Sequence, residues 1–185
     1  EYVLNDVNSK GINENIVTNE SAIGPARYPQ ATWQSIGIYL NNQYKFTEKT
    51  LLQSGLRYNQ FLLNADFDTT FYPFPFTEAT LNDGALTGSV GVVHRPNERW
   101  VISTNLATAF RSPNVDDMGK VFDSEPGSVV VPNPNLKAEY AYNVDINVAK
   151  LIGNNIKVDV SGYYTLLDNA LVRRDFTLNG EDQIL

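Results

Sequence analysis

Six stretches of the chain alternate apolar and polar residues with a period of two, and this alternation constrains the fold more than any other feature. Successive side chains of a β-strand point to opposite faces, so each stretch predicts a strand with one apolar face. Helical periodicity is almost absent, and the sequence therefore predicts an all-β fold. The predicted strands run from Trp33 to Phe46, Leu51 to Ala65, Leu86 to Arg95, Arg99 to Arg111, Glu139 to Lys150 and Ile156 to Asp168.

The connections between these strands alternate in length. Short connections lie at residues 47–50, 96–98 and 151–155, whereas about twenty residues separate the second strand from the third and nearly thirty separate the fourth from the fifth. Short turns at one rim and long loops at the other are typical of outer-membrane barrels. The sequence therefore predicts an antiparallel up-and-down transmembrane β-barrel segment, a partial barrel of six to eight strands.

The two faces of these strands differ in a way that suits a membrane. In the strand at 99–111, Trp100, Leu106 and Phe110 stand at positions of one parity, and Asn105 and Arg111 stand at positions of the other. Charges are expected on the second face only, where small polar residues suit a water-filled lumen. Ten residues at about 3.3 Å each, tilted by about 40°, span roughly 25 Å, which is the height of the apolar band between two aromatic girdles. Aromatic packing in a soluble β-sandwich is the alternative explanation.

Composition excludes several classes of function. The chain has 185 residues with 14 Lys+Arg against 21 Asp+Glu, a net charge of −7, and it contains no Cys, one His and one Met. An acidic chain without a basic run argues against nucleic-acid binding. The residues needed for disulfides, for common metal centres and for His-dependent catalysis are scarce. We expect no enzyme, no cofactor and no metal site, and no apolar run is long enough for a membrane-spanning helix.

Two motifs flank the longest loop. They read Phe110-Arg111-Ser112-Pro113-Asn114 and Pro132-Asn133-Pro134-Asn135-Leu136-Lys137-Ala138-Glu139. The pair resembles the FRAP and NPxLxPE signatures of TonB-dependent outer-membrane receptors, with Ser112 and Ala138 as departures. The segment Tyr163–Asn169 also resembles the following strand of that family.

The resemblance implies a 22-stranded barrel with a plug domain, of which residues 1–185 would be a partial barrel without the plug and the remaining strands. It implies a receptor in the outer membrane of a Gram-negative bacterium that takes up a scarce nutrient such as an iron chelate, haem or cobalamin. Its partners would be outer-membrane lipid, that small ligand, and the inner-membrane TonB complex acting through the plug. The alternative is a small complete outer-membrane barrel, or an adhesive or structural surface domain, without a transport role.

The motif residues themselves favour a structural role. Pro113 ends a strand because it cannot donate a ladder hydrogen bond, and Asn133, Pro134 and Asn135 form a turn signal. The family motif comprises Phe110, Arg111, Ser112, Pro113, Asn133, Pro134, Asn135 and Leu136. The loop from 114 to 131 contains no His, so haem ligation by that route is not expected.

Candidate ligand-binding residues lie in the two long loops and at the rim. The aromatic residues Phe71, Tyr72, Phe74 and Phe76 either contact a flat ligand or cover the barrel mouth. Asp116 and Asp117 either bind a hard cation or are solvated.

Two arginines on the lumen parity offer a further candidate. Arg111, with Arg57, either attracts an acidic chelate or pairs with the lumen acids Asp145 and Asp159.

Overall fold

The computed structural model describes residues 1–74, 76–120, 131, 133, 135–172, 177 and 180, and all statements below concern these residues. They form nine strands and one short helix. In chain order these are β1 (Tyr2–Val7), β2 (Gly11–Glu14), β3 (Ser21–Gly24), β4 (Gln30–Thr47), β5 (Thr50–Asp66), β6 (Glu78–His94), β7 (Trp100–Arg111), α1 (Val115–Gly119), β8 (Glu139–Ile152) and β9 (Ile156–Asp168). None of the helical residues described is part of a segment long and apolar enough to cross a bilayer.

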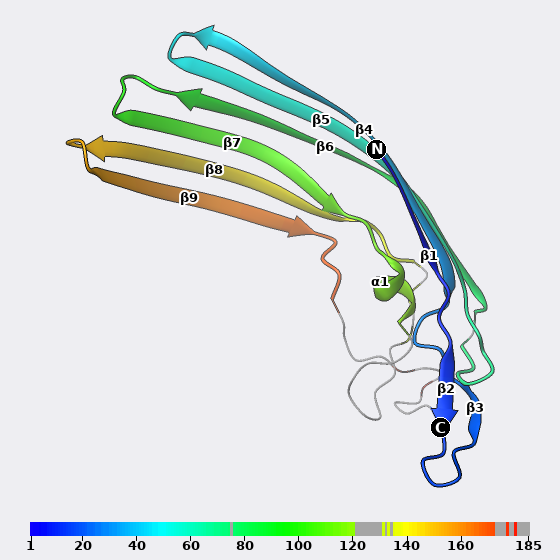
Figure 1. Cartoon of the computed structure of the whole chain (residues 1–185). Coiled ribbons are helices and arrows are strands. Elements are labelled where there is room, and N and C mark those ends of the chain that lie inside the picture. Colours follow the sequence, from blue (N-terminus) through cyan, green and yellow to red (C-terminus); the bar gives the residue numbers. More distant parts are fainter. Residues whose placement is uncertain are drawn as a thin grey trace.

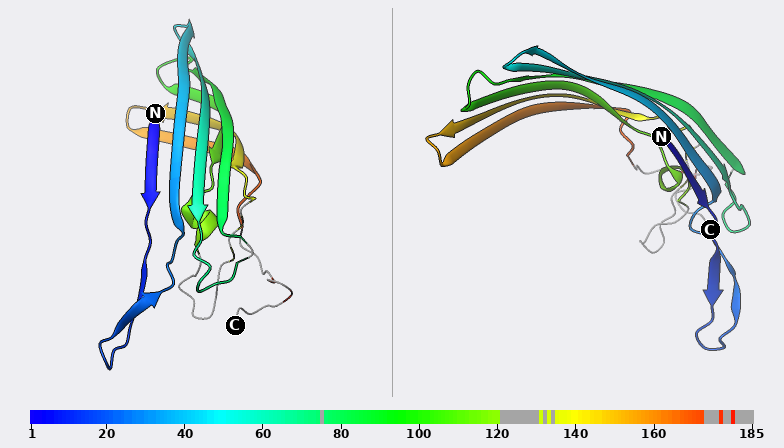
Figure 2. Two further views of the ribbon diagram at one scale, coloured as in Figure 1. Left: turned by 90° about the vertical axis from the view of Figure 1, so that its right-hand side faces the viewer. Right: turned by 45° about the horizontal axis from the view of Figure 1, so that its top comes forward.

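Seven strands form one antiparallel sheet in the order β1-β4-β5-β6-β7-β8-β9, and β2 pairs with β3 in a separate hairpin. The sheet curves like a section of a wide barrel wall, with α1 on its concave side (Figures 1 and 2). The strands β1 and β9 lie at opposite edges and do not pair with each other. The prediction of an up-and-down partial barrel is confirmed, and the described strands do not form the small closed barrel of the alternative.

The six predicted strands correspond to β4 to β9 within three residues at each end, except at the start of β6, whereas β1, β2 and β3 were not predicted. Strand β6 begins at Glu78 and not at Leu86, because its first half pairs with residues 59–66 of β5. The loop between β5 and β6 therefore comprises residues 67–77 instead of about twenty residues. Long-range pairing, and not the weak local alternation of residues 78–85, extends this strand.

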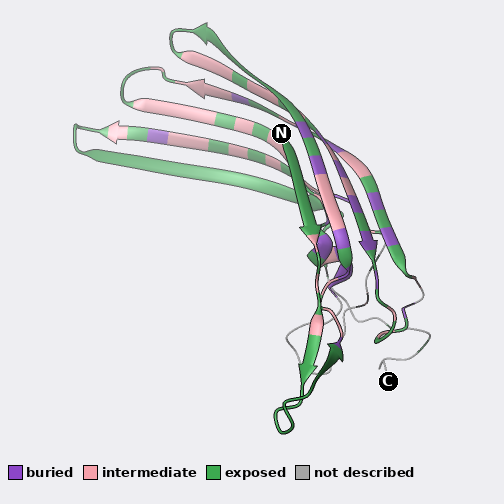
Figure 3. Cartoon of the chain, turned by 45° about the vertical axis from the view of Figure 1, so that its right-hand side comes forward, coloured by how far each residue is buried: buried purple, intermediate pink, exposed green. Residues whose placement is uncertain are grey.

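The two faces of the sheet carry the residues that the alternation predicts. On the convex face, Ile38 is 72% exposed and Val160 is 64% exposed, as a surface in contact with lipid requires. Figure 3 shows exposed and less exposed positions alternating along parts of β4 to β8, whereas β9 at the sheet edge is exposed throughout. The expectation that charges keep to the other face is wrong at the strand ends, since Asp66, Glu78 and Asp168 have the outward parity at the long-loop end, and Lys150 shares the outward parity of Val148. It lies at the short-turn end, where a lysine can reach the membrane surface.

The turn between β8 and β9 depends on a glycine. Gly153 has a φ of +62°, and a Cβ placed there would meet no atom within 4 Å. We expect Gly153→Ala to lower the free energy of unfolding by about 1 kcal/mol through backbone strain alone. Urea unfolding of the intact receptor in lipid vesicles measures this loss. Gly162→Ala is the control, because a Cβ at Gly162 lies 3.8 Å from Ile146 Cγ2, an ordinary contact. Equal losses in both variants would contradict the explanation.

Candidate functional site

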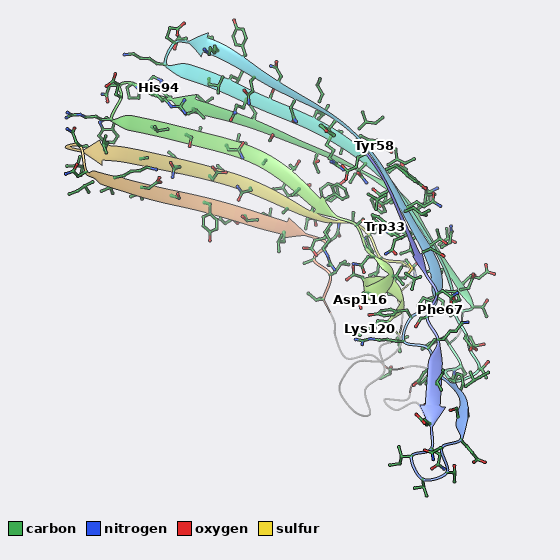
Figure 4. All side chains as sticks on the ribbon, in the orientation of Figure 1. Trp33, Tyr58, Phe67, His94, Asp116 and Lys120 are labelled. Carbon is green, nitrogen blue, oxygen red and sulfur yellow. The ribbon has the colours of Figure 1, made fainter. Side chains whose placement is uncertain are left out.

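An apolar core covers the concave face at the long-loop end of the sheet. Phe61 and Leu63 of β5 are fully buried, and Leu81 and Ala85 of β6 lie in the same cluster. The run Phe61-Leu62-Leu63 places apolar side chains on both parities, so this part of β5 is apolar on the concave face as well as the convex one. Figure 4 shows Trp33, Phe67, Asp116 and Lys120 gathered around α1 at this end. The candidate site therefore lies on a packed apolar core.

The helix α1 packs against this core. Its first turn is fixed by a capping box, in which Asn114 Oδ1 accepts from the Asp117 backbone N–H at 3.0 Å and Asp117 Oδ2 accepts from the Asn114 N–H at 3.1 Å. Val115 and Met118 are buried against the core. The motif that begins at Phe110 thus continues into a helix that covers the core.

Arg111 connects three elements at the rim. Its guanidinium donates to Asp117 Oδ1 of α1 and lies 3.9 Å from Glu139 Oε2 of β8. The same Glu139 oxygen accepts from the Leu171 N–H at 3.0 Å. Two carboxylates therefore face the positive charge of Arg111, and this side chain holds α1 to the ends of β7 and β8.

The acidic pair in α1 is engaged within the protein. Asp116 Oδ1 accepts from the Tyr28 hydroxyl at 2.9 Å, and Asp117 is bound as described above. Among the described residues, no group of three His, Cys, Asp or Glu side chains is arranged to hold a metal ion. The sequence offered no local signal for Tyr28, which lies far from α1 along the chain.

The aromatic run in the loop 67–77 forms a stack. The rings of Phe74 and Phe76 are 5.8 Å apart and nearly parallel, and Phe67 meets both rings edge-on. Tyr72 stacks on Phe74 at 6.0 Å. Phe74 is buried whereas Phe71 is 37% exposed. Most of the run therefore covers the core, and Phe71 is the ring turned most toward solvent.

The start of this loop is ordered by an aspartate turn. Asp68 Oδ1 accepts from the Thr70 backbone N–H at 2.9 Å. Hydrogen bonds from the Thr70 side chain and backbone hold the pKa of Asp68 below its ordinary value. This carboxylate is therefore ionised at neutral pH and stabilises the turn that leads to the aromatic residues.

Phe110 does not lie in an outward aromatic band as the sequence predicted. Its ring stacks on Phe61 at 6.2 Å, among the residues that pack against the core. The reason is a break in the sheet, because the ladder between β6 and β7 ends at the pair Ser89 and Ala107. Beyond it, Thr108 Oγ1 accepts from the Gly88 N–H at 2.8 Å in place of a ladder bond. The end of β7 is then free to turn Phe110 inward.

The second motif is described only in part, because Pro132 and Pro134 lie outside the described residues. The Asn135 N–H donates to Asn133 Oδ1 at 2.9 Å, which forms the expected turn. Leu136 packs against the core. In the first motif Ser112 is half-buried and Pro113 is fully buried. The described motif residues therefore have structural contacts.

Neither lumen aspartate pairs with an arginine that the structure describes. Asp145 Oδ2 accepts from Asn143 at 3.1 Å, and Asp159 pairs with Lys157 at 3.3 Å. Arg57 instead pairs with Glu1 at 2.9 Å. The hypothesis of pairing between Arg57 or Arg111 and these aspartates is wrong, because each aspartate has a nearer partner two residues away on its own strand.

Solved structures of similar fold are receptors and transporters. The copper transporter OprC matches with 19% identity over 89% of this chain and 25% of its own, with a TM-score of 0.67. A double mutant of the Serratia marcescens hemophore receptor HasR, in complex with its hemophore HasA and heme, matches with 16% identity over 82% of this chain and 28% of its own, with a TM-score of 0.68. The siderophore receptor PiuA from Acinetobacter baumannii matches with 21% identity over 77% of this chain and 20% of its own, with a TM-score of 0.59. The chain thus spans about a quarter of the length of these proteins.

A comparison with curated proteins gives no match. A family model described as "TonB dependent receptor-like, beta-barrel" matches residues 2–182. This family consists of transport receptors and not of enzymes, which confirms the expectation of a non-enzymatic chain. With nearly the whole chain matched, and with an open antiparallel wall of the same fold as part of two receptors and one transporter, the chain belongs to the TonB-dependent receptors of the Gram-negative outer membrane, as part of their β-barrel.

Proposed function

We propose that the receptor containing this chain takes up a scarce nutrient, an iron chelate, haem or cobalamin, and that the long-loop end of β5 to β8 contributes to its capture. The TonB complex of the inner membrane would supply energy through a plug domain outside residues 1–185. The observation that carries the proposal is the aromatic loop 67–77, in which Tyr72 stacks on Phe74, Phe74 stacks on Phe76, and the neighbouring Phe71 is exposed.

A preformed aromatic surface suits a ligand with a flat or apolar face. Rings that already pack against one another lose little conformational freedom on binding. The charged residues nearby support the surface instead of presenting free charge, since Arg111 faces Asp117 and Glu139. We therefore assign Phe71 and Tyr72 to ligand contact, and Arg111, Asp116 and Asp117 to positioning of α1.

Copper is a less suitable ligand for this part of the receptor. Copper(I) prefers thiolate and thioether donors, and imidazole suits copper as well. The chain has no Cys. Its one Met, Met118, is buried beneath α1, and its one His, His94, bonds Thr50 at the short-turn end. The similarity to a copper transporter therefore concerns the fold.

Ligand binding by loop variants of the full-length receptor tests this proposal. Deletion of residues 67–77, or of residues 112–138, is expected to weaken binding of the ligand by tenfold or more. Binding would be measured by fluorescence quenching with a ferric hydroxamate chelate, haemin and cyanocobalamin as probes. The double variant Phe71→Ala, Tyr72→Ala is also expected to weaken ligand binding, although the residues that pack on the core remain in place.

Tyr44→Ala is the matched control, because Tyr44 is an exposed aromatic residue at the opposite rim. Heat-modifiable migration on gels verifies that each variant forms a folded barrel. Unchanged binding in both deletions would refute capture by these loops. Failure of cells to accumulate any of the three probes in a receptor-dependent manner would refute the uptake proposal itself.

A further inference from the structure

An open hollow of about 550 Å³ lies at the short-turn end, away from the capture loops. It lies between the β6–β7 turn and the β8–β9 turn, at the start of β7 and the end of β8. Its lining combines charged, aromatic and aliphatic residues: Asn97, Glu98, Arg99, Trp100, Lys150, Leu151, Ile152 and Gly153. The proposed uptake of a nutrient at the other rim does not use this hollow.

Lys150 is the charged residue that stands out in this lining. In the described residues of β7, β8 and β9, two charged residues have the outward parity, Asp168 and Lys150. Asp168 lies at the long-loop rim, and Lys150 lies at the short-turn end. Its Nζ lies 4.5 Å from the ring centroid of Trp100. It makes no ion pair with a residue that the structure describes, whereas Lys157 at the same end and on the opposite face pairs with Asp159 at 3.3 Å.

The position of Lys150 along its strand places it at the membrane surface. Lys150 lies two residues before the end of β8 and pairs in register with Trp100, the first residue of β7, so it lies beside the short turns. The short turns of such barrels lie at the periplasmic surface of the membrane. A lysine at this level directs its ammonium to the interface, where the nearest anions are lipid phosphates.

We propose that this hollow binds the headgroup of a phosphatidylethanolamine in the periplasmic leaflet. The phosphodiester is held by Lys150 Nζ, and the ethanolamine ammonium by the carboxylate of Glu98, which likewise makes no ion pair with a described residue. Trp100 supplies the aromatic wall at the headgroup level, and Ile152 supplies an apolar surface beside it. A headgroup with one anion and one cation offers an opposite charge to Lys150 and to Glu98.

Lipid retention by the full-length receptor tests this assignment. Receptor purified in detergent, stripped of lipid and titrated with phosphatidylethanolamine, phosphatidylglycerol or inorganic phosphate would be examined by native mass spectrometry. We expect Lys150→Gln to weaken phosphatidylethanolamine binding at least fivefold and Lys150→Arg to retain it. Glu98→Gln should abolish the preference for phosphatidylethanolamine over phosphatidylglycerol. Lys157→Gln, the control on the opposite face, should bind as the unchanged receptor does.

Three results would overturn the proposal. The first is equal retention of phosphatidylethanolamine by the unchanged receptor and by Lys150→Gln, with folding of both verified by heat-modifiable migration. The second is binding of phosphatidylglycerol by the unchanged receptor as tight as that of phosphatidylethanolamine. The third is full displacement of the lipid by millimolar inorganic phosphate, which would mark the hollow as a site for the free anion.

Discussion

Phe61→Ala is expected to lower the free energy of unfolding of the receptor by about 3–5 kcal/mol. Phe61 is fully buried on the concave face of β5, and its ring stacks on Phe110 of β7. Truncation removes apolar surface and leaves a cavity that the surrounding strands cannot close, because their ladders fix the backbone. It also leaves Phe110 without its stacking partner, in the region where β7 has separated from β6.

Chemical unfolding in lipid vesicles measures the total loss, and hydrogen exchange locates it. Amides of α1 and of the loop 67–77 should lose protection in Phe61→Ala, whereas amides of the β8–β9 hairpin should keep it. Phe61→Leu is the control, since a similar volume is retained and the expected loss is below about 1.5 kcal/mol. An equal loss of protection in the β8–β9 hairpin would contradict a local core around Phe61.

Gly119→Ala is expected to destabilise the docking of α1 on β5. A Cβ at Gly119 would lie 2.6 Å from Pro29 Cγ, 2.7 Å from Pro29 Cδ and 3.4 Å from Phe67 Cε1. The proline ring cannot rotate away as a flexible side chain would, so the helix must shift. Overpacking of this kind costs about 1–3 kcal/mol, which exceeds the gain of up to about 1 kcal/mol that Ala brings to a helix end.

Two measurements distinguish this steric effect from a general one. Thermal unfolding of the intact receptor should show a lower midpoint for Gly119→Ala, while Gly162→Ala, the same change at an open position of β9, should leave it unchanged. Binding of the nutrient should weaken in Gly119→Ala as well, because a shift of α1 disturbs the packing of Phe67 beneath the aromatic loop. A raised midpoint would show that the helix accommodates the methyl group without displacement.

Several features of this protein followed from the sequence alone. Alternation with a period of two located six of the strands, since strand geometry forces successive side chains to opposite faces. The boundaries of β9 were predicted as observed, because the alternation is clear from Ile156 to Ser161 and turn residues flank the strand, Asn154 and Asn155 before it and Asn169 after it. The alternation of short and long connections indicated the membrane barrel, and the two motifs pointed to its family.

Other features depended on contacts between residues far apart in the sequence. The first half of β6 is strand because β5 lies beside it, although its own residues are weakly patterned. Phe110 lies inward because the β6–β7 ladder ends at Ser89 and Ala107, and no local pattern marks that separation. The run Phe61-Leu62-Leu63 breaks the alternation and is a local sign that the concave face carries a core.

The candidate site likewise has some features that the sequence indicates and others that depend on tertiary contacts. The sequence identified the aromatic loop and the acidic pair, because aromatic clusters and neighbouring carboxylates are visible in a one-dimensional pattern. Only the tertiary structure decided which of them face solvent: Phe74 is buried while Phe71 is exposed, and Asp116 and Asp117 are bound to Tyr28 and Arg111. Side-chain parity is a local property of a strand and can be read from the order of residues. Partners in a loop are set by chain segments that meet only when the sheet forms.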